Sequence, residues 1–232
     1  MPLTRPELSG RAQRRGRLDV TDVLTPLAYR IVPVVVLDEV EDADPLAAAL
    51  VAGGLPVAEV TFRTPAARDA IQVMAERGDI LVGAGTILTA HQVDAAVAAG
   101  ASFVVSPGFS SAVVERCAEH GVPVLPGAVT ATEIQAALEA GLDVVKFFPA
   151  ATSGGPAAIR ALAAPFPGLR FVPTGGIGAD NLADYLTIDA VAAVGGSWMV
   201  SRSLISAGSF AEVSRLAREA VGLANAAATG RQ

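Results

Sequence analysis

A strand–helix pattern that repeats eight times constrains the fold of this chain more than any other feature. From Arg30 onward, a short run rich in Val and Ile ends in glycine, proline or a polar residue, and an Ala-rich amphipathic stretch follows. Such alternation indicates parallel strands joined by right-handed crossovers. The expected strands are 31–37, 57–62, 80–85, 103–106, 122–125, 144–148, 170–173 and 190–194. The expected helices are 45–52, 65–77, 90–99, 111–119, 131–140, 155–163, 179–185 and 210–224.

Eight such units predict an α/β protein with the (β/α)8 TIM-barrel fold. A length of 232 residues suits one barrel, and 52% hydrophobic residues supply its core. A doubly wound open sheet is the alternative, but it needs a glycine-rich turn after the first strand, and residues 37–44 contain no glycine. We expect one compact domain over 22–225, a flexible N-terminal extension over 1–21 and a flexible tail over 226–232.

Composition excludes several classes of function. A formal net charge of −6 argues against a general nucleic-acid surface, and no apolar stretch reaches the ~18 residues that cross a membrane. Cys117 is the single cysteine, so we expect no internal disulfide and a cytoplasmic location. The two histidines, His91 and His120, are predicted to point toward opposite faces of the barrel. We therefore expect no metal site and no cofactor.

Lys146 is the only lysine in the chain, and it lies in the apolar run 144–149. An arginine would serve better in a structural ion pair, because it keeps its charge and grips a carboxylate with two hydrogen bonds. A neutral amine can attack a ketone, and burial disfavours the charged form of an amine. The position thus favours a Schiff-base lysine. The alternative is a structural lysine whose amine reaches water or a carboxylate.

The second strand carries polar side chains on one face. Side chains alternate along a strand, so Glu59, Thr61 and Arg63 share one face and Val60 and Phe62 share the other. The apolar pair is predicted to face the helices and the polar triplet to face the barrel interior. Glu59 is then a candidate general acid/base, and Arg63 can grip a carboxylate. A purely structural ion pair inside the barrel is the alternative.

Glycine pairs at the ends of the seventh and eighth strands predict a phosphate site. They are Gly175–Gly176 and Gly195–Gly196, and Ser197 adds a hydroxyl donor. Backbone N–H groups at these two strand ends form the usual phosphate site of the fold. Thr174, beside the first pair, is expected to contact the sugar chain. Turn-forming glycines without a ligand are the alternative.

Six motifs together resemble the 2-keto-3-deoxy-6-phosphogluconate (KDPG) and 4-hydroxy-2-oxoglutarate aldolase family. The resemblance runs from about residue 24 to residue 222, and it rests mainly on the first and fourth motifs. In order they are EVTFRT at 59–64, GAGT at 83–86, SPG at 106–108, KFFP at 146–149, PTGG at 173–176 and GGSW at 195–198.

The resemblance implies a class I aldolase, a lyase of the Entner–Doudoroff pathway, that cleaves KDPG to pyruvate and glyceraldehyde 3-phosphate. Cleavage of 4-hydroxy-2-oxoglutarate to pyruvate and glyoxylate is a second activity of the family. A homotrimer is implied as well. By resemblance, the catalytic residues are Lys146 and Glu59, the pyruvyl carboxylate binds Arg63 and Thr86, the pocket is lined by Pro107 and Phe148, and the phosphate binds Gly175, Gly176, Gly196 and Ser197.

Other functions remain open at the level of the sequence. An aldolase for the galactonate-derived epimer would use the same residues. A phosphosugar isomerase or epimerase without a Schiff base would use the phosphate site and leave Lys146 unexplained. A non-enzymatic barrel would bind phosphosugars without turnover. Trapping with borohydride distinguishes the Schiff-base enzymes from the rest.

Overall fold

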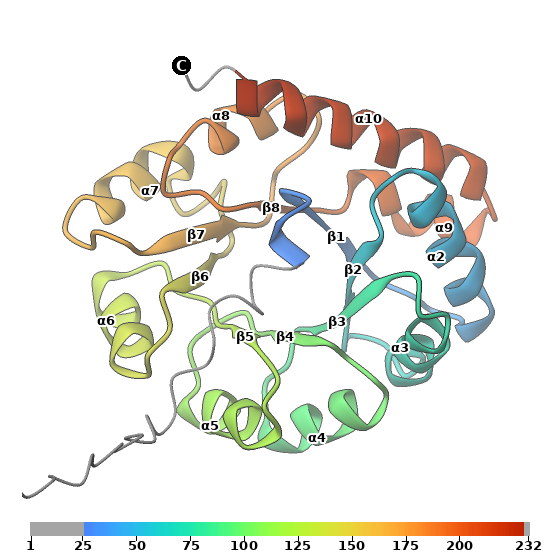
Figure 1. Ribbon diagram of the computed structural model, residues 1–232, viewed down its shortest axis with the longest axis horizontal. Coiled ribbons are helices and arrows are strands. Elements are labelled where there is room, and N and C mark those ends of the chain that lie inside the picture. Colours follow the sequence, from blue (N-terminus) through green and yellow to red (C-terminus); the bar gives the residue numbers. More distant parts are fainter. Residues whose placement is uncertain (1–25, 230–232) are drawn as a thin grey trace, which may run out of the picture.

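Eight strands in the described part of the chain form a ring that is surrounded by helices, as Figure 1 shows from one end of the barrel. The structure is a computed structural model, and it describes residues 26–229. The strands are β1 (Ile31–Val35), β2 (Val57–Thr61), β3 (Leu81–Gly85), β4 (Phe103–Val105), β5 (Val124–Leu125), β6 (Val144–Phe147), β7 (Arg170–Pro173) and β8 (Val194–Gly196). The longer helices are α2 (Ala43–Ala52), α3 (Ala67–Glu76), α4 (Ala90–Ala98), α5 (Ser111–His120), α6 (Ala131–Glu139), α7 (Gly155–Ala163) and α10 (Phe210–Thr229).

The parallel strands close on themselves. Six strands pair in the order β5-β4-β3-β2-β1-β8, and β6 pairs with β7. Single parallel bridges join these two sheets, from Gly127 to Lys146 on one side and from Thr174 to Gly195 on the other. The predicted (β/α)8 barrel is therefore confirmed, and the open-sheet alternative is wrong.

The strand registers align the carboxyl ends of neighbouring strands at one end of the barrel. Glu59 of β2 pairs with Gly83 of β3, and Thr61 pairs with Gly85. On the far side of the ring, Lys146 of β6 pairs with Val172 of β7. Polar residues that are distant in sequence thus project into one space inside the barrel.

Small aliphatic side chains fill most of the layer between strands and helices. Val60 of β2 and Ala47 of α2 are fully buried there, and Phe62 packs against the same core. Phe147 and Phe171 make an edge-to-face contact with ring centroids 6.2 Å apart. Glu59 lines a cavity inside the barrel, so the alternation of a strand places Val60 on the opposite face of β2, as predicted.

The ends of several elements differ from the sequence-based expectation. β8 covers Val194–Gly196 instead of 190–194, because these residues pair with Ile31 to Pro33 of β1. In the preceding apolar run, only Val191 bridges to β7. Helix α8 (Leu182–Leu186) begins three residues later than predicted, and the short helices η1 (Val40–Asp42), η2 (Trp198–Val200) and α9 (Arg202–Ser206) were not predicted.

The helix boundaries bear on the predicted domain limits. Helix α6 starts with a capping box, in which the side chains of Thr130 and Glu133 bond each other's backbone N–H. Helix α10 continues to Thr229, so the predicted limit at residue 225 falls inside it. The N-terminal extension over 1–21 lies outside the described residues. Within 26–229, no helix combines the length and hydropathy needed to span a membrane.

Candidate active site

A buried ion pair joins β6 to β2 across the barrel interior. The Lys146 Nζ atom lies 3.0 Å from Glu59 Oε1 and 3.4 Å from Glu59 Oε2. The two side chains are only 7% and 4% exposed. Burying two charges is costly even when they pair, so the pair is weak evidence for a purely stabilising role. The Lys146 Nζ atom also sits 5.3 Å from the centroid of the Phe148 ring.

Gly85 on β3 makes room for the Glu59 carboxylate. A Cβ atom at position 85 would lie 2.3 Å from Glu59 Oε1, and one at position 83 would lie 2.2 Å from the ring of Phe103. Both distances are far shorter than van der Waals contact. The glycines of the GAGT motif therefore provide space for Glu59 and Phe103.

Arg63 at the end of β2 is oriented by a short relay of hydrogen bonds. Its Nε atom donates to Thr61 Oγ1 at 3.1 Å, and the Thr61 hydroxyl donates to the backbone oxygen of Val35 at 2.8 Å. Thr61 is buried, whereas Arg63 is exposed at the mouth of the barrel. This arrangement leaves the terminal nitrogens of the guanidinium directed away from the relay, where they can bind a carboxylate.

One cleft collects most of the predicted binding residues. Its lining consists of Val34, Arg63, Phe148, Thr174, Gly175, Gly176, Ile177, Gly195, Gly196 and Ser197. Gly175 and Gly176 adopt φ values of +99° and +73°, which favour glycine. The cleft lies where the carboxyl ends of β1, β2, β6, β7 and β8 converge, the face on which barrel enzymes carry their active sites.

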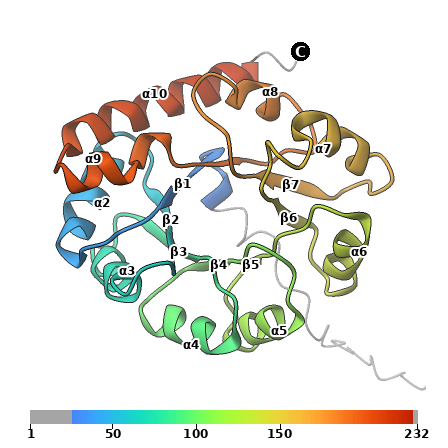
Figure 2. The same cartoon turned by 180° about the vertical axis from the view of Figure 1, so that it is seen from behind.

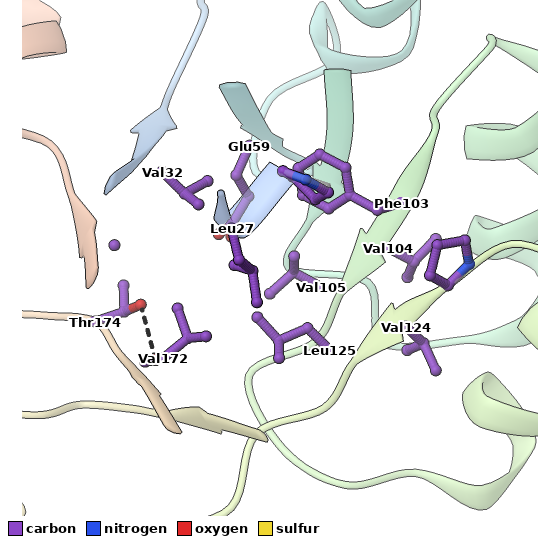
Figure 3. Close-up of a pocket in the computed structure, with 13 residues that line it drawn as sticks. Leu27, Val32, Glu59, Phe103, Val104, Val105, Val124, Leu125, Val172 and Thr174 are labelled. Atoms are coloured by element: carbon purple, nitrogen blue, oxygen red, sulfur yellow. Dashed lines mark hydrogen bonds between the residues drawn. The ribbon is translucent and has the colours of Figure 1, made fainter. Parts of the chain in front are cut away.

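A second cavity lies inside the barrel next to Glu59. Figure 3 shows Leu27, Val105 and Leu125 around it, with Thr174 on the opposite wall. Leu27 belongs to the short segment before β1, which crosses the middle of the barrel in Figures 1 and 2. Thr174 and Gly195 line both this cavity and the cleft, so they separate the two spaces. The mostly aliphatic lining keeps the surroundings of Glu59 apolar.

Four predicted site residues do not line the cleft, namely Lys146, Glu59, Thr86 and Pro107, and two residues that do line it were missed. Thr86 follows Gly85 and has a φ of +57°, which is unusual for a residue other than glycine, and Pro107 packs against the position of Gly127. Val34 and Ile177 line the cleft without having been predicted. The alternation of β1 could have identified Val34, since Val32, two residues earlier, faces the interior cavity.

Away from the active site, one cluster of charged side chains joins α4 to α5. Asp94 of α4 accepts hydrogen bonds from Arg116 and His120 of α5, both at 2.6 Å. These two hydrogen bonds lower the pKa of the Asp94 carboxyl to about 2, and the one from Arg116 has the larger effect. Among residues 26–229, no group of three or more His, Cys, Asp or Glu side chains is arranged to hold a metal ion.

The family described as "Aldolase: KDPG and KHG aldolase" matches residues 23–216. The chain belongs to this family. A 2-dehydro-3-deoxy-phosphogluconate aldolase of Treponema pallidum is 54% identical over 191 residues, which cover 82% of this chain and 91% of the relative. The KHG/KDPG aldolase of Escherichia coli is 44% identical over 82% of this chain and 90% of that enzyme.

A solved structure extends the similarity to the chemistry of the family. The KDPG aldolase of Legionella pneumophila has pyruvate captured as a covalent carbinolamine intermediate. It superposes with a TM-score of 0.80 at 40% identity, covering 84% of this chain and 97% of that one. The predicted family and enzyme class are thereby confirmed: the chain is a class I aldolase, a lyase. The alternative of a phosphosugar isomerase or epimerase without a Schiff base is not supported.

Proposed function

We propose that Lys146 and Glu59 catalyse the cleavage of KDPG to pyruvate and glyceraldehyde 3-phosphate. The observation that carries the proposal is the 3.0 Å contact between Lys146 Nζ and Glu59 Oε1 in the barrel interior. At this distance from Lys146 Nζ, Glu59 can pass protons to and from a substrate that is bound to the lysine as an imine. Lys146 is the only lysine in the sequence, so no other side-chain amine competes for this role.

The reaction then proceeds in covalent steps. The amine of Lys146 adds to the C2 ketone, and loss of water gives a protonated imine. Glu59 removes the proton of the C4 hydroxyl, directly or through a water molecule, and the C3–C4 bond breaks with its electron pair moving toward the imine. Glyceraldehyde 3-phosphate leaves. The remaining enamine takes a proton at C3, and hydrolysis releases pyruvate and the free amine.

The substrate is proposed to extend from Arg63 to the glycine pairs. Arg63 and Thr86 would bind the pyruvyl carboxylate, with Pro107 and Phe148 beside the reacting carbons. Gly175, Gly176, Gly196 and Ser197 would bind the phosphate, and Thr174 would contact the sugar chain. Arg63 and these glycines line the same cleft, which supports this arrangement. Because the phosphate lies away from the breaking bond, its binding energy serves orientation.

The choice of substrate is part of the proposal. We expect KDPG to be preferred over its galactonate-derived epimer, because Thr174 offers a polar contact to the sugar chain. Cleavage of 4-hydroxy-2-oxoglutarate is proposed as a second activity, as the name of the E. coli relative indicates for that enzyme. Values of kcat/KM for the three compounds test the order. A higher value for the galactonate epimer would overturn it.

We also propose a homotrimer in the cytoplasm. The trimer rests on the resemblance to the family, and the location rests on the single, buried cysteine, Cys117. Light scattering during size-exclusion chromatography should give three times the chain mass of 23.4 kDa. A mass equal to that of one chain would refute the trimer without affecting the proposed reaction.

Borohydride reduction in the presence of pyruvate tests the catalytic proposal directly. Mass spectrometry should find a reduced pyruvyl adduct on the peptide that contains Lys146, and Lys146→Ala should show neither adduct nor turnover. The variant Glu59→Gln should still form the adduct but lose most of its turnover. An unmodified Lys146 peptide, or full activity of the Lys146→Ala variant, would overturn the proposed mechanism.

A further inference from the structure

Asn181 precedes helix α8 but does not cap it. Asparagine at a helix N-cap usually accepts a hydrogen bond from a backbone N–H of the first turn. Here the side chain makes no such bond. Instead, its Oδ1 atom accepts from the backbone N–H of Gly178 at 2.9 Å, and its Nδ2 atom donates to the backbone oxygen of Gly176 at 3.0 Å. The amide is therefore engaged by the loop before the helix.

The loop that Asn181 binds forms one wall of the cleft. Gly175, Gly176 and Ile177 all line it. Gly175 and Gly176 both have positive φ values, and a Cβ atom at Gly176 would lie 2.5 Å from Ala151 Cβ. Glycine has more conformational freedom to lose than any other residue, so a glycine-rich loop keeps one conformation only when it is held by contacts. The Gly175 backbone oxygen accepts from Ala151 N–H at 3.1 Å.

The two sides of this loop are held by different contacts. The bond from Ala151 restrains the backbone at Gly175, on the β6 side. The Asn181 amide restrains the next carbonyl, at Gly176, and the N–H of Gly178. Because a peptide group is planar, fixing the Gly176 oxygen also fixes the direction of the N–H of Ile177. Asn181 thus sets the orientation of the peptide group between Gly176 and Ile177, directly after the glycine pair, and holds the N–H of Gly178.

We propose that Asn181 is a positioning residue for the phosphate end of the cleft and a determinant of selectivity for phosphorylated substrates. The inference rests on the proposed function, in which Gly175 and Gly176 bind phosphate. A substrate that carries a phosphate gains from a preorganised loop, because no binding energy is spent on ordering it. A substrate without a phosphate, or pyruvate alone, gains no binding energy from the ordered loop, because it does not contact the glycine pair.

Two substitutions of Asn181 test the contribution of its two hydrogen bonds to the loop, and a third substitution nearby serves as a control. Asn181→Ala removes both hydrogen bonds without adding charge. Asn181→Asp keeps the size and the acceptor for Gly178 but loses the donor for Gly176. Ala179→Asp is the matched control, because Ala179 is exposed on the same loop and makes neither bond. This control adds the same charge near the phosphate end and leaves both hydrogen bonds of Asn181 intact.

Steady-state kinetics with KDPG and with 4-hydroxy-2-oxoglutarate, together with the rate of borohydride-trapped imine formation from pyruvate, tests the inference. One hydrogen bond changes affinity about 2- to 10-fold, so Asn181→Ala should raise KM for KDPG about tenfold or more. The other substrate and the pyruvate imine should stay within twofold of wild type. Asn181→Asp should raise KM for KDPG more than Ala179→Asp does.

The outcomes that overturn the inference differ from those that overturn the function. Equal losses with KDPG and with the pyruvate imine, accompanied by a lower melting temperature, would make Asn181 a structural residue only. An unchanged KM for KDPG in Asn181→Ala would remove the positioning role. Both results require a wild-type protein that cleaves KDPG. A wild type that forms no imine would instead refute the proposed function.

Discussion

Replacing Gly85 with alanine should disable the site without removing any catalytic group. The new Cβ atom would lie 2.3 Å from Glu59 Oε1, whereas ordinary van der Waals contact begins at 3.4 Å. The carboxylate must therefore move by about 1 Å, and a misplacement of that size costs about 100-fold in rate. The backbone of Gly85 is not in the left-handed region, so alanine adds no backbone strain. Overpacking should also cost about 1 to 3 kcal/mol in unfolding free energy.

The assay for this prediction couples pyruvate release to lactate dehydrogenase and records kcat with KDPG, alongside urea unfolding of each variant. Gly83→Ala is the matched control on the same strand, because its Cβ atom would meet the Phe103 ring at 2.2 Å instead of Glu59. It should lose similar stability and far less kcat. A Gly85→Ala variant with kcat within twofold of wild type would refute the assignment of Glu59 to proton transfer from this position.

Two further predictions concern the relay to Arg63 and the surface cluster around Asp94. Thr61→Val removes the acceptor for Arg63 Nε. A hydrogen bond to a charged group contributes about 1.5 kcal/mol, so KM for KDPG should rise about tenfold with a smaller change in kcat. Thr61→Ser keeps the hydroxyl and should restore the KM of the wild type. An unchanged KM would show that Thr61 does not orient Arg63. Because the folded-state pKa of Asp94 is lowered to about 2, its stabilisation is complete above the unfolded pKa and is lost as pH falls through the folded value. The melting-temperature advantage of wild type over Asp94→Asn should thus be present at pH 6 and shrink between about pH 4 and pH 2; a constant difference would contradict this.

Local patterns were sufficient to predict the barrel and to single out Lys146 and Glu59, which form a buried ion pair in its interior. The alternation of β2 placed Glu59 and Val60 on opposite faces, and the single lysine in an apolar run identified Lys146. These signals depend only on neighbouring residues in the chain. The ion pair itself follows from them once the barrel closes, because both side chains then face the same interior.

Features that depend on partners far away in sequence could not be predicted. The apolar run 190–194 resembles a strand, but the residues that pair with β1 are Val194 to Gly196. The position of β8 is set by this pairing with Ile31 to Pro33, which lie far away in the sequence. The reason for glycine at position 85 is a carboxylate on another strand. Asn181 carries a normal helix-start signal, and only the structure shows that its amide turns back toward Gly176.

Because the chain has a single lysine, the fraction of molecules that carry an imine at Lys146 can be measured by proteolysis. A lysine-specific endoprotease acting on denatured protein has one cleavage point, after Lys146, and cuts the polypeptide into two large fragments. Reductive alkylation of that amine by pyruvate blocks the cut. The proportion of uncut chain on a denaturing gel then equals the proportion of molecules whose amine had formed the imine. Native protein also shields this amine from bulky acylating reagents, because its side chain is only 7% exposed.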